Sequence, residues 1–211
     1  MIKKSTNIEY YFVTALIIFS FLLRFVSIYF VRDIQIENEW SVLLNNLINY
    51  NSYSLNSFEG QLIPSVFMPP LYPFFLYFIK TISFLKDSNF LYLVFFVQTV
   101  LSTYGVYLFY KINKNFFSNQ LSLINSFVFS IIPLNIYTCG QISSVNIQLF
   151  LSLLFLKFLF SIIKNKTQKN IIFFSIVCGF SILVRGEFLI IFIFTLFFIF
   201  ISKKINIKKL I

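Results

Sequence analysis

The segment Tyr10–Val31, YYFVTALIIFSFLLRFVSIYFV, contains a single charged residue, Arg24. A helix needs about 20 mostly apolar residues to cross the hydrocarbon core of a bilayer, so this segment is long enough. It is too long for a cleaved signal peptide, and no small-x-small cleavage site follows it. The sequence therefore predicts a transmembrane helix at this position.

The composition of the whole chain fits the same environment. Hydrophobic residues make up 58% of the 211 positions and charged residues only 11%, whereas a soluble domain is about 25% charged. Further apolar segments lie at 71–85, 90–110, 120–138, 142–163, 171–184 and 187–202. We predict an all-α fold, a polytopic transmembrane helix bundle of about six to seven membrane segments. It would form a single membrane domain over residues 1–211, multi-pass in a bacterial-type inner or plasma membrane.

The formal net charge of +10 does not indicate nucleic-acid binding, because the basic residues form no common face. They lie at the ends of the apolar segments, as expected for cytoplasmic loops under the positive-inside rule and for contact with lipid headgroups. The clusters are Lys3 and Lys4; Lys111 and Lys114; Lys164, Lys166 and Lys169; and Lys203, Lys204, Lys208 and Lys209. The chain has no histidine, and its two cysteines, Cys139 and Cys178, are far apart. Zinc sites, haem ligation by histidine and Ser-His-Asp or Cys-His catalysis are therefore excluded.

The polar interval 32–70 is where we expect chemistry. It holds four of the seven acidic residues, Asp33, Glu37, Glu39 and Glu59. An apolar stripe with helical spacing follows them at Trp40, Leu43, Leu44, Leu47 and Ile48, with Asn38 as a candidate N-cap. The spacing predicts an amphipathic helix, either on a membrane surface or packed on the bundle. We interpret the interval as an extracytoplasmic loop of catalytic type.

Four of the five prolines end this loop, at Pro64, Pro69, Pro70 and Pro73. A Pro-Pro pair favours extended chain, and a proline in the first turn of a helix costs no backbone hydrogen bond. Tyr72 suits a membrane interface. The stretch therefore predicts the place where an extended loop becomes a membrane helix. Its role is either to start that helix or, in addition, to position a substrate.

Charged residues also interrupt the apolar stretch 171–201, at Arg185-Gly186-Glu187. A charge at the centre of a membrane costs at least about 2.5 kcal/mol, and a glycine between two charges is a natural break. We expect two short helices to meet there. The break is either a turn between two membrane segments or the place where a cation holds an anionic ligand.

In their order along the chain, these features resemble the GT-C superfamily of membrane glycosyltransferases. The likeness is to the protein mannosyltransferase-like and aminoarabinose transferase-like group, which uses polyprenyl-phosphate sugars. It covers about residues 20–200 and rests on the acidic first loop, the helix ending in 51–55, the Met68-Pro69-Pro70-Leu71-Tyr72-Pro73 start and Arg185-Gly186-Glu187. The family has a basic residue in place of Met68 and a proline in place of Gly186. Its members carry further spans, so the chain resembles an N-terminal half or a minimal paralogue.

The resemblance implies inverting sugar transfer from a polyprenyl-phosphate carrier to a hydroxyl of a lipid, glycan or protein acceptor. A loop carboxylate would be the general base, with Glu37 preferred, Glu39 second and Asp33 as an out-of-register substitute. Arg185 would stabilise the phosphate leaving group. The other expected substrate-binding residues are Glu187, Tyr72, Pro69 and Pro70. No cofactor is expected, although Glu37-x-Glu39 leaves a divalent cation open.

Two other functions and two topologies stay open. The chain is alternatively a non-catalytic membrane subunit or scaffold of an envelope-glycan system, or a transporter, although transporters carry matched broken helices and the sequence suggests one break. If all seven segments cross, the lysines at 164–169 fall outside, against the positive-inside rule. If 71–85 returns without crossing, every lysine cluster lies inside and Arg185 lies outside with the acidic loop.

Overall fold

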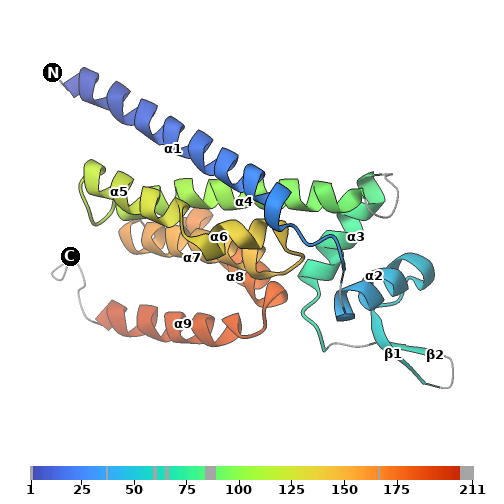
Figure 1. Cartoon of the computed structure of the whole chain (residues 1–211). Coiled ribbons are helices and arrows are strands. Elements are labelled where there is room, and N and C mark those ends of the chain that lie inside the picture. Colours follow the sequence, from blue (N-terminus) through green and yellow to red (C-terminus); the bar gives the residue numbers. More distant parts are fainter. Residues whose placement is uncertain are drawn as a thin grey trace.

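The computed structural model describes residues 2–36, 38–58, 61–64, 67–83, 89–165 and 167–204. The fold is all-α apart from one small hairpin, which confirms the expected fold class (Figure 1). The helices are α1 (Ile2–Val31), α2 (Asn38–Tyr50), α3 (Leu71–Ser83), α4 (Phe90–Asn113), α5 (Asn119–Ser130), α6 (Pro133–Tyr137), the 3₁₀ turn η1 (Thr138–Gly140), α7 (Val145–Lys164), α8 (Gln168–Val184) and α9 (Phe188–Lys204).

By length and composition, three helices within the described residues can cross a membrane: α1 from Glu9 onward, α4 and α7. A fourth span is possible if α5 and the α6–η1 segment, bent by 61°, count as one. The expected six to seven membrane segments are not supported. Helix α3 has 13 residues and rises about 20 Å, and α8 and α9 have 17 each and rise about 25 Å. A hydrocarbon core is about 30 Å thick.

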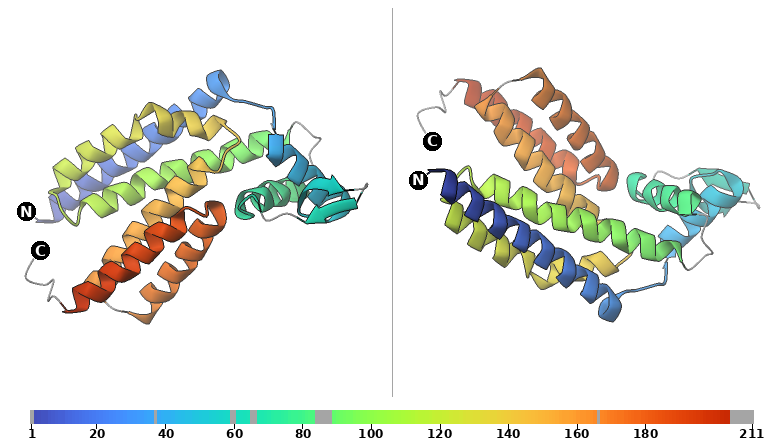
Figure 2. Two further views of the ribbon diagram at one scale, coloured as in Figure 1. Left: turned by 90° about the horizontal axis from the view of Figure 1, so that it is seen from below. Right: turned by 90° about the horizontal axis from the view of Figure 1, so that it is seen from above.

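Helix α4 is the centre of the bundle. It packs against α1, α5 and α7, and α7 packs in turn against α8. Figure 2 shows α1, α4 and α5 side by side on one flank and α7, α8 and α9 on the other. The buried core between them is formed by aliphatic and aromatic side chains that include Val94, Phe95, Leu151, Phe155 and Val177.

The two ends of this bundle differ in charge. The N-terminal end of α1, the α4–α5 and α7–α8 connections and the C-terminal end of α9 lie together (Figure 1). We call this the lysine end, because Lys111, Lys114, Lys164 and Lys169 lie there. The opposite end, the loop end, carries residues 32–36, α2, the hairpin, α3, η1 and the Arg185–Glu187 turn. This arrangement matches the topology in which 71–85 does not cross.

The segment predicted as one apolar helix over 120–138 is broken between Ser130 and Pro133. Proline has no N–H to continue the helical ladder, so the carbonyl four residues earlier, that of Phe129, loses its donor. The Asn135 side-chain amide lies 3.4 Å from this carbonyl oxygen instead. Three serines spaced by four residues, Ser122, Ser126 and Ser130, form the buried face of α5, as small residues do where membrane helices approach closely.

Arg24 explains how the break is tolerated inside the bundle. Its side chain is fully buried. The Nη1 atom donates to the carbonyl of Ser130, the last residue of α5, at 3.1 Å, and Nε donates to Ser102 Oγ of α4 at 2.7 Å. Nη1 also donates to the carbonyl and hydroxyl of Ser20. A helix C-terminus carries partial negative charge, so α5 supplies the electrostatic partner that a carboxylate would otherwise provide.

The first loop is more ordered than the sequence predicted. The apolar stripe of α2 packs against α3 and β1, with Leu43, Leu44 and Leu47 buried. This confirms the amphipathic helix and shows that it packs on the bundle. Asn51 follows α2 with φ 49°, a left-handed conformation that asparagine tolerates at helix ends. Strands β1 (Ser54–Phe58) and β2 (Gln61–Pro64) then pair as an antiparallel hairpin.

Candidate functional site at the loop end

Asp33 is held where the first membrane helix meets η1. Its N–H donates to the Gly140 carbonyl at 2.9 Å, and its carboxylate accepts the N–H of Gln35 at 2.9 Å. Gln141 donates from its side chain to the Val31 carbonyl at 2.8 Å. The approach is close, because a Cβ on Gly140 would lie 3.2 Å from the Arg32 Cα. Asp33 is therefore half-buried and fixed in position.

Of the other loop carboxylates, only Glu39 is among the described residues. Glu39 is in the first turn of this helix and is exposed. Within the described residues its side chain has no hydrogen-bond or ion-pair partner, so it is free to meet a ligand. Its place near the helix N-terminus also gives it a stabilising role, since a carboxylate there offsets the helix dipole by about 0.3–1 kcal/mol. Glu37 and Glu59 lie outside the described residues.

The proline-rich stretch starts helix α3, as predicted. The N–H of Phe74 donates to the Pro70 carbonyl at 3.1 Å, and Pro69 and Pro70 are half-buried just before the helix. Tyr53, from the segment after α2, donates its hydroxyl to the Met68 carbonyl at 2.7 Å and stacks on Phe74. Burial raises the pKa of the Tyr53 hydroxyl, which keeps it protonated as a donor. The loop and the helix start are thus joined.

Tyr72 is buried and does not lie at the surface that a substrate would reach. Its ring packs edge-on against Trp40 with centroids 5.0 Å apart, and its hydroxyl lies 3.3 Å from Gln98 Oε1. The Gln98 amide donates in turn to the carbonyls of Cys139 and Gln141, at 3.1 and 2.9 Å. Gln98 therefore links α3, α4 and η1, and Tyr72 extends the contact to Trp40 of α2. No local sequence pattern marks Gln98, because its partners are more than 20 residues away in the chain.

The Arg185–Glu187 turn joins α8 to α9, which confirms the predicted meeting of two short helices. The Arg185 N–H donates to the Ser181 carbonyl at 3.0 Å, and its carbonyl accepts the Phe188 N–H at 3.0 Å. Both charged side chains are exposed, and neither has a partner within the described residues. The guanidinium is thus a free donor of two parallel hydrogen bonds, the geometry that suits a phosphate.

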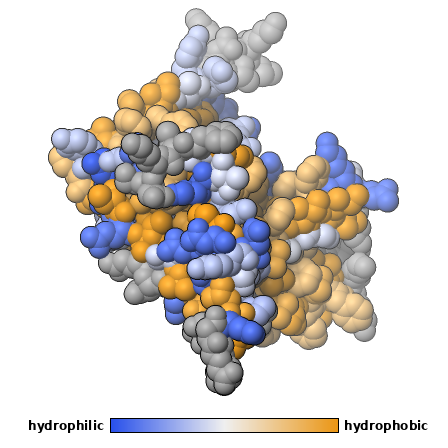
Figure 3. Space-filling model, turned by 90° about the vertical axis from the view of Figure 1, so that its right-hand side faces the viewer, coloured by the Kyte–Doolittle hydropathy of each residue, from blue (hydrophilic) through white to orange (hydrophobic). Residues whose placement is uncertain are grey.

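Asp33, Glu39 and the Arg185–Glu187 turn share one end of the molecule, but no hydrogen bond or ion pair joins them within the described residues. Asp33 lies against η1, whereas the Arg185 turn ends α8, which packs against α3 (Figure 2). No ion pair joins Arg185 to Asp33 or Glu39 in the described part of the chain. Figure 3 views this end and shows hydrophilic residues across its middle, bordered by hydrophobic ones.

Metal binding gains no support from the residues that the structure describes, because no three of their Cys, Asp or Glu side chains come together. No protein-family model matches the chain, and no curated protein or solved structure matches it either.

Proposed function

We propose that the chain is the membrane module of a glycosyltransferase that moves a sugar from a polyprenyl-phosphate carrier to a hydroxyl acceptor. The transfer takes place at the extracytoplasmic face of a bacterial-type inner membrane, with the loop end outside. The lysine end faces the cytoplasm, as the positive-inside rule requires.

One observation carries this proposal. The acidic first loop, the proline-started helix α3 and the free Arg185 come from distant parts of the sequence, yet all lie at the loop end, opposite the lysine end (Figure 1). Enzymes that use lipid-linked sugars need a base and a phosphate-binding cation at one membrane face. A chain that only anchored a partner would have no need to bring these groups to the same end.

The residues have distinct roles in this reaction. A loop carboxylate takes the proton from the acceptor hydroxyl as its oxygen attacks the anomeric carbon. The bond from that carbon to the phosphate oxygen breaks, and the configuration inverts. The polyprenyl phosphate leaves with additional negative charge, which Arg185 stabilises through charge-assisted hydrogen bonds. Glu37 is the preferred base, because Glu39 has a helix-end role available and Asp33 is already bound to Gln35.

The test is transfer by the purified protein in liposomes that contain a radiolabelled sugar on polyprenyl phosphate. We expect labelled acceptor and free polyprenyl phosphate in equal amounts, and no product when the donor is a nucleotide sugar. Absence of product with every polyprenyl-linked donor and acceptor class tried would contradict the proposal.

A non-catalytic membrane subunit is the second candidate, favoured by the separation of Asp33 from Arg185. In that case Arg185 still binds a polyprenyl phosphate, but no sugar leaves it. The same liposome assay distinguishes a transferase from a non-catalytic subunit, because a protein that binds the donor but transfers no sugar is a binding subunit. A transporter gains less support. Such proteins carry matched broken helices, whereas the two breaks among the described residues, the bent α5–α6 pair and the α8–α9 turn, differ in form.

A further inference from the structure

A groove runs along the lipid-facing side of the bundle between α1 and α4. It has a volume of about 350 Å³, within the range of about 300–1,000 Å³ that small-molecule pockets occupy. Ile17 and Phe21 of α1 form one wall, and the other is formed by Val100, Thr103, Tyr104 and Tyr107 of α4. The lining is almost entirely apolar, so an aliphatic chain fits it.

An unpaired cation lies at the lysine end of this groove. Lys111 follows Tyr107 by one turn of α4, and its Nζ lies 5.4 Å from the centroid of the Tyr107 ring. The side chain is exposed, and within the described residues it has no hydrogen-bond or ion-pair partner. Its charge is therefore available to a ligand whose tail occupies the groove.

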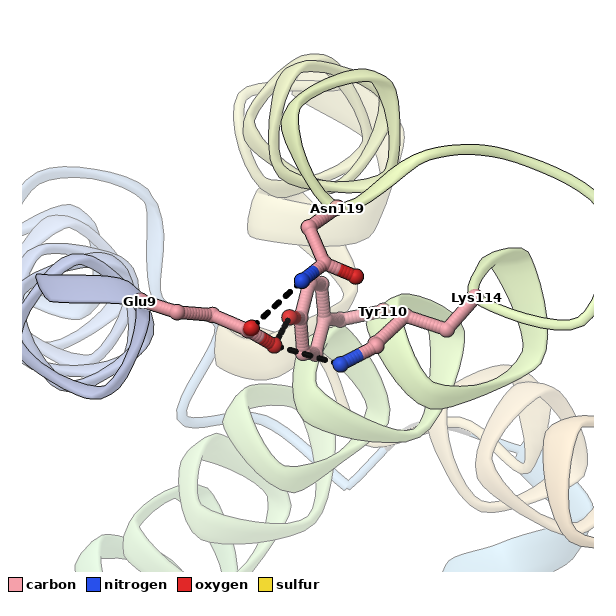
Figure 4. Close-up of polar contacts among 4 residues, drawn as sticks. All are labelled: Glu9, Tyr110, Lys114 and Asn119. Atoms are coloured by element: carbon pink, nitrogen blue, oxygen red, sulfur yellow. Dashed lines mark hydrogen bonds and ion pairs between the residues drawn. The ribbon is translucent and has the colours of Figure 1, made fainter. Parts of the chain in front are cut away.

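The neighbouring lysine is not available in the same way. Glu9 of α1 accepts hydrogen bonds from Lys114 Nζ and Asn119 Nδ2, each at 2.5 Å, and from the Tyr110 hydroxyl (Figure 4). This cluster ties α1 to α4 and α5 and neutralises Lys114. Among the described side chains, Lys111 is then the cation beside the groove that has no hydrogen-bonded or ion-paired partner, although the Glu9 carboxylate is near enough to interact with it electrostatically.

A second groove, between α1 and α5, provides an internal comparison. Its volume, about 380 Å³, is similar, and it too is apolar. The lining residues are Phe12, Ala15, Leu16, Phe19, Leu123, Ile124 and Phe127. No tyrosine lines it, and the described lysine nearest to the start of α5, Lys114, is paired with Glu9. As far as the described side chains go, the two grooves thus differ in the charge at their lysine end and hardly in volume.

We propose that the α1–α4 groove is a specific site for an anionic glycerophospholipid of the leaflet that the lysine end faces. The lipid phosphate binds Lys111, and an acyl chain lies along Tyr107, Tyr104 and Phe21. The α1–α5 groove accepts acyl chains without a preference for headgroup charge. Anionic lipids of the cytoplasmic leaflet are attracted by juxtamembrane lysines, at about 1 kcal/mol for each.

The experiment is native mass spectrometry of the protein titrated with phosphatidylglycerol or phosphatidylcholine. Wild type is expected to retain one phosphatidylglycerol molecule in preference to phosphatidylcholine. Lys111→Gln should weaken phosphatidylglycerol binding about fivefold and leave phosphatidylcholine binding unchanged, and Lys111→Arg should restore the preference. The matched control is Lys169→Gln. This lysine is also exposed at the lysine end and lies over a ring, that of Phe173 at 6.0 Å, but it adjoins neither groove.

Variants that fill one groove or the other test the contribution of the acyl chain separately from that of the headgroup. Val100→Phe should reduce binding of the preferred lipid, whereas Ala15→Phe in the α1–α5 groove should leave it unchanged. Equal losses from Lys111→Gln and Lys169→Gln, or equal retention of the two lipids by wild type, would overturn the proposal. Because none of these variants touches the loop end, failure of this proposal is independent of sugar transfer.

Discussion

Arg24 of α1 contacts the C-terminal end of α5, and Arg185 follows the C-terminal end of α8, yet their surroundings are opposite. Arg24 is fully buried and donates to Ser130 at the end of α5 and to Ser102 of α4. Arg185 follows α8, is exposed, and has no side-chain partner in the described part of the chain. The first arginine holds a broken helix in the bundle. The second is positioned by its helix but keeps its hydrogen-bonding capacity for another molecule.

A charged residue within an apolar segment is therefore not by itself a ligand site. Intramembrane charges are often functional, and that rule singled out Arg185 because two charges and a glycine interrupt the segment. Arg24 is the more deeply buried of the two, and its acceptors are backbone and serine oxygens. What separates the two roles is whether the guanidinium already has partners. Nε and Nη1 of Arg24 are hydrogen-bonded, although its buried Nη2 is not, whereas no side-chain donor of Arg185 has a partner within the described residues.

Among the expected effects on stability, the largest comes from replacing the buried arginine. Arg24→Met leaves the Ser130 carbonyl without its donor inside the bundle. A buried polar group left unpaired costs about 1–3 kcal/mol, so the free energy of unfolding should fall by that amount. Arg185→Met should change it by no more than about 0.5 kcal/mol, as for other exposed positions. Unfolding of both variants in mixed micelles measures the difference.

Arg24→Lys is the control for charge. Lysine keeps the positive charge but offers a single donor group in place of the planar fork that reaches Ser102 and Ser130 together. We expect a stability between those of wild type and Arg24→Met. Equal destabilisation by Arg24→Met and Arg185→Met would remove the distinction between the two arginines.

The second prediction concerns ligand binding at the exposed arginine. Arg185→Lys should weaken binding of a polyprenyl-phosphate sugar at least about tenfold, because a hydrogen bond to a charged group contributes about 1.5–3 kcal/mol. Membrane insertion should be unchanged. Binding of a labelled donor to the protein in nanodiscs measures it, with Arg32→Lys as the control, since the Arg32 guanidinium lies over the Tyr92 ring. Unchanged donor affinity in Arg185→Lys would mean that Arg185 does not bind the donor and only forms part of the turn between α8 and α9.

The positions of the main helices were predictable from the sequence, because each long helix coincides with a hydrophobic segment. The segments at 90–110 and 142–163 correspond to α4 and α7, and the predicted break at Gly186 was found. The number of membrane-crossing helices was overestimated, because apolar character alone does not ensure sufficient length. Pro133 and the four-residue spacing of Ser122, Ser126 and Ser130 were visible signals of the broken α5–α6 segment.

The polar contacts were not predictable in the same way. Gln98 meets Tyr72 and Cys139, and Glu9 meets Lys114, across 26 to 105 residues of chain. Such pairings depend on how the helices pack, and no local pattern encodes them. Tyr72 illustrates the consequence, since the sequence suggested an interfacial side chain and the structure buries it against Trp40.

A smaller effect is expected from glycines at the loop end. A Cβ on Gly140 would lie 3.2 Å from the Arg32 Cα, whereas one on Gly186 would have nothing within 4 Å. Gly140→Ala should therefore lower the free energy of unfolding by about 1 kcal/mol, at the low end for an overpacked contact. Gly186→Ala should leave it unchanged. Thermal unfolding of the pair checks this, and equal midpoints would mean that Asp33 is not held by a close contact.

The assignment of the two ends to membrane faces is tested without any change in stability. Gln61 is exposed in β2 at the loop end, and Lys169 is exposed in α8 at the lysine end. In a background with Cys139 and Cys178 replaced, Gln61→Cys should react with an impermeant thiol reagent in intact cells. Lys169→Cys should react only after permeabilisation. The reverse pattern would place the proposed site in the cytoplasm.

The central claim, that the loop end transfers a sugar, is tested most directly by comparing wild type with Glu37→Gln in the liposome assay. Removing a general base lowers the rate about 10²–10⁴-fold. We predict a loss of that size in Glu37→Gln with donor binding intact, and a milder loss in Glu39→Gln. Wild-type turnover in Glu37→Gln together with loss in Asp33→Asn would make Asp33 the base. Full activity in the single Asn or Gln variants of all four loop carboxylates, or no transfer by wild type, would contradict the account.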